Sequence, residues 1–262
     1  MVDTTGGRGR TCTRGKKRPG RTPLSASEDC SPVLFNLSCM PTESVPTPRS
    51  QQPPAGLQPV LASLFSLVFP QHCVLCLRQG TGLCMRCIAT LVPAPELFAP
   101  PGFDTCDSLL SYTGATKDLV AALKFHNHRD AVGLLGFAMA QLLDPPKDST
   151  ASEPTVTWAP TSAARKTKRG FDQSELLARA VATSLGFSSA RLLRRLPGDA
   201  QTGHSRAERL LGPQFIATQR APERVLLIDD VRTTGATLCA AADALIESGA
   251  RSIQGLTLAV TL

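Results

Sequence analysis

Apolar and polar positions along residues 105–262 predict strands and helices in alternation. Short apolar runs bounded by polar or turn residues predict strands at 108–112, 155–159, 225–228 and 253–262. Apolar residues spaced three and four apart predict helices at 116–125, 132–143, 172–185 and 237–248. Because strands that alternate with helices usually form βαβ units, we predict an α/β fold with a mostly parallel sheet flanked by helices.

The residues before this region show no such periodicity. Residues 1–58 are rich in Arg, Pro, Ser, Thr and Gly, and they hold too little apolar surface to offset the entropy lost on ordering. We predict a disordered tail there, with Met40 as an alternative start of the chain. The apolar run 59–70 is too short for a membrane span, which needs about 20 residues, so we expect a short helix packed on the body.

These patterns divide the chain into three parts: the tail 1–58, a helix with a cysteine module at 59–92, and a main domain at 105–262. The formal net charge of the 262 residues is +7. The tail holds 8 Lys and Arg against 4 Asp and Glu, so the main domain is only mildly basic. Although a basic tail can contact nucleic acid, the charge of the folded part does not indicate a nucleic-acid-binding domain.

Four of the nine cysteines follow a C-x2-C-x7-C-x2-C spacing, at Cys73, Cys76, Cys84 and Cys87. Each pair can hold one face of a tetrahedral ion, and glycines in the short spacer permit the reversal that joins the pairs. Two disulfides are the alternative, but the chain otherwise has the character of a cytoplasmic protein. A redox dithiol would need only one pair. We therefore predict a structural Zn²⁺ site with all four positions filled, and a cytoplasmic location.

The segment 225–238 combines an apolar strand, two adjacent carboxylates and a loop of small and hydroxyl residues that leads into a helix. Carboxylates accept hydrogen bonds from sugar hydroxyls, with or without Mg²⁺, and free N–H groups at a helix start bind phosphate. This order of residues predicts a site for a phosphorylated sugar. Its candidate ligands are Asp229, Asp230, Thr233, Thr234, Gly235, Ala236 and Thr237.

Other sites that follow an apolar strand fit less well. In receiver domains the acid pair lies in the first strand, whereas only 32 residues follow Asp230 here. A Walker A loop requires a Lys directly after its second glycine, and none follows Gly235. The G-x-G-x-x-G pattern of dinucleotide-binding proteins is absent as well.

A basic stretch follows the predicted strand 155–159 and includes Arg165, Lys168 and Arg169. It has an alternative reading as a solvated run of charges. However, ligands of parallel sheets bind beyond the carboxyl ends of the strands, where the acid pair is also expected. We therefore predict that this stretch contacts the phosphate groups of the same ligand.

The segment 225–238 resembles the phosphoribosyl-pyrophosphate loop of type I phosphoribosyltransferases. The motif RGFDQS at 169–174 resembles the R-G-F-N-Q-[AS] element of one branch, the ComF family, which is competence-type and amidophosphoribosyltransferase-like. Gln201, Arg209 and Phe215 match a further element of that family. The paired Cys-x-x-Cys and the apolar lead-in belong to the same branch, so the resemblance covers about residues 60–262.

The resemblance implies the type I phosphoribosyltransferase fold and the binding of 5-phosphoribosyl 1-pyrophosphate (PRPP) with Mg²⁺. Asp229 and Asp230 would bind the ribose hydroxyls, residues 233–237 the 5-phosphate, and residues 158–162 would form the pyrophosphate loop. Arg165, Lys168 and Arg169 would face the pyrophosphate on a mobile segment. Such enzymes act by positioning and by stabilising the charge of the departing pyrophosphate, without a covalent nucleophile.

Three departures from the family pattern leave the acceptor of the phosphoribosyl group open: Asp172 stands in place of Asn, Leu211 in place of Asn, and Ala159-Pro160-Thr161 in place of a Val-Pro-type loop. The first hypothesis is a phosphoribosyltransferase with an unknown acceptor. The second is a non-catalytic adaptor that senses PRPP and contacts DNA or a protein partner through the cysteine module. An association with the DNA-uptake machinery or with single-stranded DNA, as in competence, is implied by analogy with the family alone.

Overall fold

The computed structural model describes residues 72–125, 129–143, 152–197 and 213–262. The predicted tail 1–58, the apolar run 59–70, and the family element at 201–211 lie outside the described residues. The predicted division of the chain into three parts therefore stays a prediction.

Four parallel strands form the central sheet, in the order β1-β6-β5-β2. Their bounds are Thr105–Ser111 for β1, Thr155–Trp158 for β2, Arg224–Arg232 for β5 and Ser252–Val260 for β6. The two central strands, β5 and β6, are buried along most of their length. Continuous burial is expected of a parallel sheet that is covered on both faces, and it explains the uninterrupted apolar runs in the sequence.

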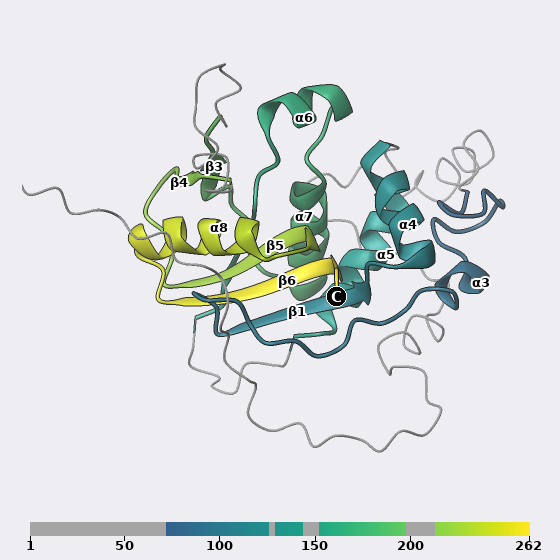
Figure 1. Cartoon of the computed structure of the whole chain (residues 1–262), viewed down its shortest axis with the longest axis horizontal. Helices are drawn as coiled ribbons and strands as arrows, with labels where there is room; N and C mark the ends of the chain where they lie inside the picture. Colours follow the sequence, from purple (N-terminus) through teal and green to yellow (C-terminus); the bar gives the residue numbers. More distant parts are fainter. Residues whose placement is uncertain (1–71, 126–128, 144–151, 198–212) are drawn as a thin grey trace, which may run out of the picture.

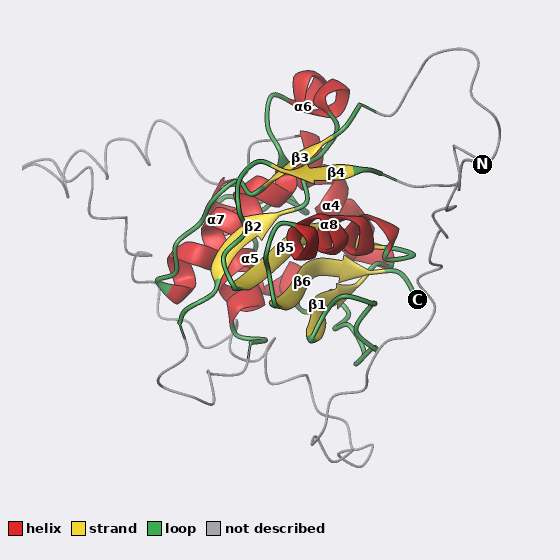
Figure 2. Ribbon diagram, turned by 90° about the vertical axis from the view of Figure 1, so that its left-hand side faces the viewer, coloured by secondary structure: helices red, strands yellow, loops and turns green. Residues whose placement is uncertain are grey.

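Helices cover both faces of this sheet (Figures 1 and 2). Three helices pack on one face: α4 (Gly114–Phe125), α5 (Arg129–Ala140) and α7 (Gln173–Leu185). On the other face lie α8 (Ala236–Glu247) and a hairpin of β3 (Leu193–Arg195) and β4 (Phe215–Ala217). Two short helices complete the described elements, α3 (Met85–Ile88) and α6 (Ala163–Arg169). The predicted α/β class with a parallel sheet is confirmed.

Most predicted bounds are shifted by up to three residues, and three larger differences concern β5, α6 and the β3–β4 hairpin. Strand β5 continues past Ile228 to Arg232, because the backbone of the acid pair still pairs with β6, from Asp229 opposite Thr257 to Arg232 opposite Val260. The basic stretch is helix α6, with Ser162 as its N-cap. The hairpin β3–β4 was not expected, because its strands of three residues are too short to show a period.

The cysteine module packs directly on the main domain. Val74, Leu83 and Ile88 are buried in the same apolar cluster as Leu119 of α4 and Leu135 of α5. A Cβ on Gly82 would lie only 2.9 Å from the backbone carbon of Asp130, so the spacer closely approaches the start of α5. The module is thus attached to the helical face of the sheet. Within the described ranges, no helix has the length and apolar character needed to cross a membrane.

Helix α5 touches α7 at a glycine, which generates a first prediction. A Cβ on Gly136 would lie 2.9 Å from the carbonyl carbon of Ala180, whereas a Cβ on Gly133 would meet nothing within 4 Å. We expect Gly136→Ala to lower the free energy of unfolding by about 1–3 kcal/mol, because α7 must move. The matched change Gly133→Ala should raise it by up to about 1 kcal/mol. Urea unfolding measures both, and equal effects of the two changes would contradict the packing.

Candidate functional site

A cavity of about 260 Å³ lies at the carboxyl ends of β2 and β5. The residues that line it come from the ends of three strands and from the helices and hairpin around them. They are Tyr112, Lys124, Ala159, Pro160, Thr161, Arg165, Arg169, Asp172, Gln173, Ser174, Arg195, Asp229, Asp230, Val231, Thr233 and Thr237. The cavity therefore lies at the carboxyl ends of the strands, the edge of the sheet at which the sequence pattern predicts a ligand.

Asp229 is the buried carboxylate of this cavity, with 7% of its surface exposed. Its Oδ1 accepts a hydrogen bond of 2.9 Å from the Ser174 hydroxyl and another of 2.9 Å from the backbone N–H of Asp230. Burial, followed by the neighbouring charge of Asp230, raises the pKa of Asp229 to about 8. A positively charged or hydrogen-bond-donating ligand next to Asp229 would therefore favour loss of its proton.

Asp230 is more exposed, and it forms an ion pair with a lysine from another element. The Lys124 Nζ lies 3.1 Å from its Oδ2, and the backbone N–H of Val231 donates to its Oδ1 at 2.7 Å. Lys124 lies in the last turn of α4, within the helix predicted at 116–125, and it lines the cavity. The acid pair is therefore in direct contact with the Lys124 cation.

The loop after β5 leads into α8 through a glycine in the left-handed region. Gly235 is the residue before the helix and has φ of 79°, a conformation that other residues adopt only with strain. The backbone N–H of Ala236 donates to Thr234 Oγ1 at 3.4 Å. Thr233 and Thr237 line the cavity, whereas Thr234, Gly235 and Ala236 form the loop without lining it. The start of a twelve-residue helix thus lies at the rim of the cavity.

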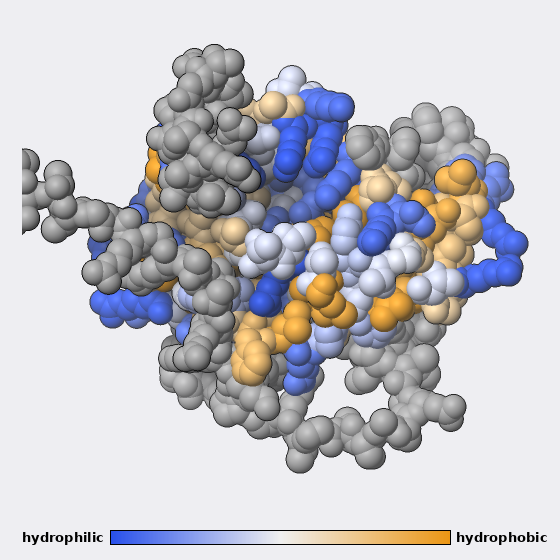
Figure 3. All heavy atoms as spheres, in the orientation of Figure 1, coloured by the Kyte–Doolittle hydropathy of each residue, from blue (hydrophilic) through white to orange (hydrophobic). Residues whose placement is uncertain are grey.

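Helix α6 stands above the sheet and brings basic residues to the cavity. Hydrophilic side chains gather over it in the space-filling view (Figure 3). Of the three residues predicted to contact phosphate, Arg165 and Arg169 line the cavity, and Lys168 is not among the lining residues. None of the helix residues is buried.

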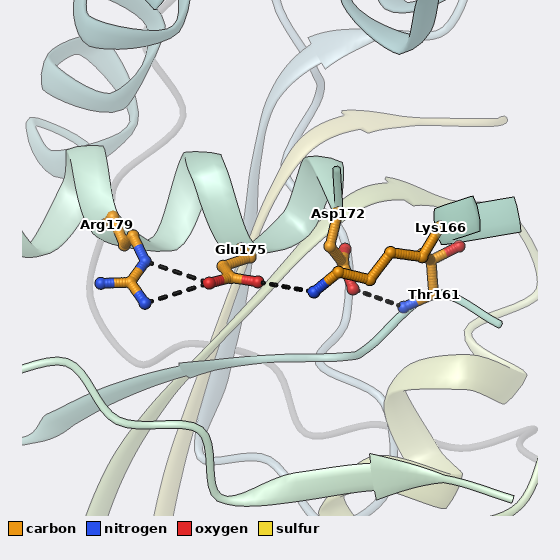
Figure 4. A network of polar contacts seen from close by, with 5 residues as sticks. All are labelled: Thr161, Lys166, Asp172, Glu175 and Arg179. Carbon is orange, nitrogen blue, oxygen red and sulfur yellow. Dashed lines mark hydrogen bonds and ion pairs between the residues drawn. The ribbon is translucent and has the colours of Figure 1, made fainter. Parts of the chain in front are cut away.

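A polar network holds α6 and the loop before it against α7 (Figure 4). The Lys166 Nζ lies 3.4 Å from Glu175 Oε2, and Arg179 donates to Glu175 Oε1 at 3.0 Å. The backbone N–H of Thr161 donates to Asp172 Oδ2 at 2.9 Å, which joins the loop after β2 to the start of α7. These contacts fix the position of the loop predicted to face pyrophosphate.

Two lining residues come from elements that sequence reasoning did not connect with the site. Tyr112 follows β1 directly, so the rule that ligands bind beyond strand ends would have found it. Arg195 lies on β3, with its guanidinium 5.7 Å from the centre of the Phe215 ring on β4. No signal in the sequence marks Arg195, because its approach depends on how the hairpin packs.

The four cysteines of the N-terminal module converge. Their Sγ atoms lie within 4.8 Å of one another, so the group can hold a metal ion. Burial alone would raise the pKa of the Cys73 thiol, but backbone N–H donors of Cys76, Cys84 and Leu75 lower it to about 6. A set of four cysteines, with one thiolate already favoured, fits Zn²⁺. Figure 1 shows the module beside α4 and α5, away from the β3–β4 hairpin.

Comparison with known proteins identifies relatives of the chain. No protein-family model matches it. The chain is 30% identical over 189 residues to the competence protein ComFC of Streptococcus pneumoniae, which covers 69% of this chain and 82% of that protein. The chain belongs to the ComF family.

Further relatives align over different lengths of the chain. The DNA utilization protein YhgH of Salmonella typhimurium is 28% identical over 202 residues, 72% of this chain and 89% of that protein. ComFC of Bacillus subtilis is 39% identical over 103 residues, 38% of this chain and 41% of that protein.

Two solved structures also match the chain at 23% sequence identity and a TM-score of 0.34. One is described as the structure of the allosteric regulatory enzyme of purine biosynthesis, and the match covers 50% of this chain and 26% of that one. The other is glutamine PRPP amidotransferase from B. subtilis complexed with ADP and GMP, with 48% and 25% covered. The chain thus spans about a quarter of each of these proteins.

The structure gives a physical reason why this ComF protein tolerates Asp172 where the family motif has Asn. Asp172 is 4% exposed, and its burial raises the pKa of the carboxyl group. Its Oδ2 accepts a hydrogen bond from the backbone N–H of Thr161, a bond that the oxygen of an Asn amide can accept as well. The side chain at this position can therefore be an acid or an amide without loss of the contact that joins the loop after β2 to α7.

The cysteine cluster generates a prediction about metal content. We expect reduced wild-type protein to carry about one Zn²⁺ per chain, and Cys76→Ser or Cys84→Ser to lose most of it, because a structural site needs all four thiolates. The control Cys106→Ala removes a buried cysteine outside the cluster and should keep its zinc. Metal analysis by mass spectrometry measures this, and zinc retained in both serine variants would refute the site.

The pKa of Asp229 generates a prediction about stability. Between pH 3.8 and about 8 the folded protein holds a proton that the unfolded chain has lost, so stability falls as pH rises through this window. Asp229→Asn removes this titration. The free energy of unfolding of the variant relative to wild type should therefore increase between pH 5 and pH 8 by more than about 1 kcal/mol.

The matched control is Asp118→Asn, which replaces an exposed carboxylate on α4. Its effect on unfolding should stay nearly constant over the same range of pH. Denaturant unfolding at the two pH values measures both variants, and an Asp229→Asn effect that does not change with pH would contradict the burial of an unfavourable charge.

Proposed function

We propose that this ComF protein binds PRPP together with Mg²⁺ and transfers the phosphoribosyl group to an acceptor, with release of pyrophosphate. One observation carries the proposal. A single cavity combines an acid pair at a strand end, a glycine-containing loop at a helix start, and arginines on a separate helix. A ligand with a diol and phosphates at both ends is complementary to these three groups.

The ribose and 5-phosphate would lie along β5 and the loop after it. Asp229 and Asp230 can accept hydrogen bonds from two neighbouring hydroxyls. The loop 233–237, from Thr233 to Thr237, offers hydroxyl groups and the N–H groups at the start of α8, and the helix dipole favours a phosphate there. We assign all five residues of the loop to the 5-phosphate.

Mg²⁺ fits the acid pair. Burial, and then repulsion by the neighbouring Asp230 carboxylate, raises the pKa of Asp229, so a cation at the pair would relieve an unfavourable charge. Carboxylate oxygens are also ligands that Mg²⁺ prefers. Asp229 and Asp230 would hold the ion together with oxygens of the ligand. The ion would supply positive charge against the phosphates and would favour the ionised form of Asp229.

The pyrophosphate end of the ligand would face α6. Arg165 and Arg169 line the cavity there. We propose that Lys168, on the same helix, contacts the pyrophosphate when the ligand is bound. Leaving-group departure from C1 places negative charge on the pyrophosphate, which these cations stabilise. Because positioning and charge stabilisation suffice for such a transfer, no covalent nucleophile is needed.

The cysteine cluster would hold Zn²⁺ in a structural role. Four cysteine ligands leave no open coordination position, so the ion would brace the module against α5 and take no part in the transfer. The cytoplasmic location expected from the sequence stays a prediction.

A second function is favoured by the names of the relatives. One relative is a competence protein and another a DNA utilization protein. In this alternative the cavity senses PRPP without turnover, and the protein acts as an adaptor in DNA uptake, where the DNA-uptake machinery or single-stranded DNA would be its partner. Both functions require PRPP binding in the same cavity, so binding and turnover must be measured separately.

Binding of PRPP with Mg²⁺ is measured by isothermal titration calorimetry. We expect the wild-type protein to bind and the double variant Asp229→Asn, Asp230→Asn to bind at least tenfold more weakly, because the hydroxyls and Mg²⁺ lose both carboxylates. The control Asp118→Asn, Asp243→Asn removes two exposed carboxylates outside the cavity and should bind as wild type does. Absence of wild-type binding would contradict both functions.

Turnover is measured by pyrophosphate release in the presence of bases, amines and nucleic acids. Release that depends on one class of acceptor supports the transferase and names that class. Binding of PRPP without release under every acceptor would instead favour the adaptor.

A further inference from the structure

Two arginines that line the cavity are not held in an ion pair by a described carboxylate. Arg165 comes from α6 and Arg195 from β3, and both line the cavity. Among the residues that the structure describes, neither forms an ion pair. By contrast, Lys124 in the same cavity is paired with Asp230 at 3.1 Å. The part of the cavity formed by α6 and β3 therefore carries positive charge that no ion pair between described residues neutralises.

Arg195 is held in place rather than free to turn into solvent. It pairs across the hairpin with Phe215, and its guanidinium lies 5.7 Å from the centre of the Phe215 ring. The backbone N–H of Leu196 donates to the carbonyl of Gln214 at 2.9 Å, which extends the hairpin next to this pair. Stacking on an aromatic ring fixes the plane of a guanidinium and leaves its N–H edge available to a ligand.

The environment of Arg195 disfavours its charge when no ligand is present. Burial, and then the positive charge of Arg165, lowers the pKa of the Arg195 guanidinium, and the smaller opposing effects of Asp229 and Asp172 do not offset them. A half-buried cation next to another cation is unfavourable unless an anion lies between them. Two guanidinium forks at one anion are a common arrangement for phosphate groups, which accept two parallel hydrogen bonds from each fork.

We infer that Arg195 binds the pyrophosphate of the ligand from the β3–β4 hairpin, opposite the charges supplied by α6. The inference rests on the proposed function, because it assigns the anion by elimination. The ribose hydroxyls take the acid pair and the 5-phosphate takes the loop 233–237, so the pyrophosphate is the anionic group of PRPP that remains. The β3–β4 hairpin and α6 would thus both bind the pyrophosphate, which is the leaving group.

Isothermal titration calorimetry with two probes tests the inference: inorganic pyrophosphate with Mg²⁺, and ribose 5-phosphate. Arg195→Ala should weaken pyrophosphate and PRPP binding at least tenfold and leave the affinity for ribose 5-phosphate within about twofold. Arg195→Lys should recover part of the loss, because a point charge replaces the fork. The matched control Arg194→Ala changes an exposed arginine on the same strand and should bind both probes as wild type does.

The outcomes separate the inference from the proposed function. Unchanged pyrophosphate affinity in Arg195→Ala would overturn the inference, including the case in which the arginine instead receives an anionic acceptor. An equal loss for both probes in Arg195→Ala and Arg195→Lys would also overturn it, because the arginine would then support the hairpin. Wild-type protein that binds pyrophosphate through Arg195 but not ribose 5-phosphate would refute the proposed function while the pyrophosphate site stands.

Discussion

Burial of the Asp229 carboxyl group at the end of β5 is the constraint on which the cavity depends. A carboxylate with 7% exposure is costly unless donors surround it, and its donors are the Ser174 hydroxyl and the backbone N–H of Asp230. Because Ser174 lies in the first turn of α7, this one hydrogen bond ties the start of that helix to the strand. The same turn then brings Asp172 to the loop after β2, so three walls of the cavity have fixed positions.

The regular part of the fold was predictable because burial leaves a periodic trace in the sequence. The strands β5 and β6, and the helix α7 that ends before Gly186, were predicted within a few residues of their observed bounds. Elements without a buried face left no such trace. Helix α6 buries none of its residues, and three of the last four residues of β5 are charged, so no helix was predicted at 163–169 and the strand was predicted to end at Ile228.

Some residues of the candidate site could likewise be predicted from the sequence, and others could not. The acid pair and the loop 233–237 are contiguous in the chain, so their shared chemistry was visible in the order of residues alone. Lys124 and Arg195 come from elements far from that loop in sequence, and only the packing of α4 and of the hairpin brings them to the cavity. Lys168 belongs to the same helix as Arg165 and Arg169 but is not among the residues that line the cavity, so its contact with the ligand stays a prediction.

The central claim is that the cavity at the end of β5 receives PRPP with Mg²⁺. A crystal structure of the protein with both bound tests it most directly. The account predicts the ribose hydroxyls and Mg²⁺ at Asp229 and Asp230, and the 5-phosphate at the loop 233–237. A ligand bound elsewhere on the protein, or a cavity that stays empty at saturating PRPP and Mg²⁺, would contradict it.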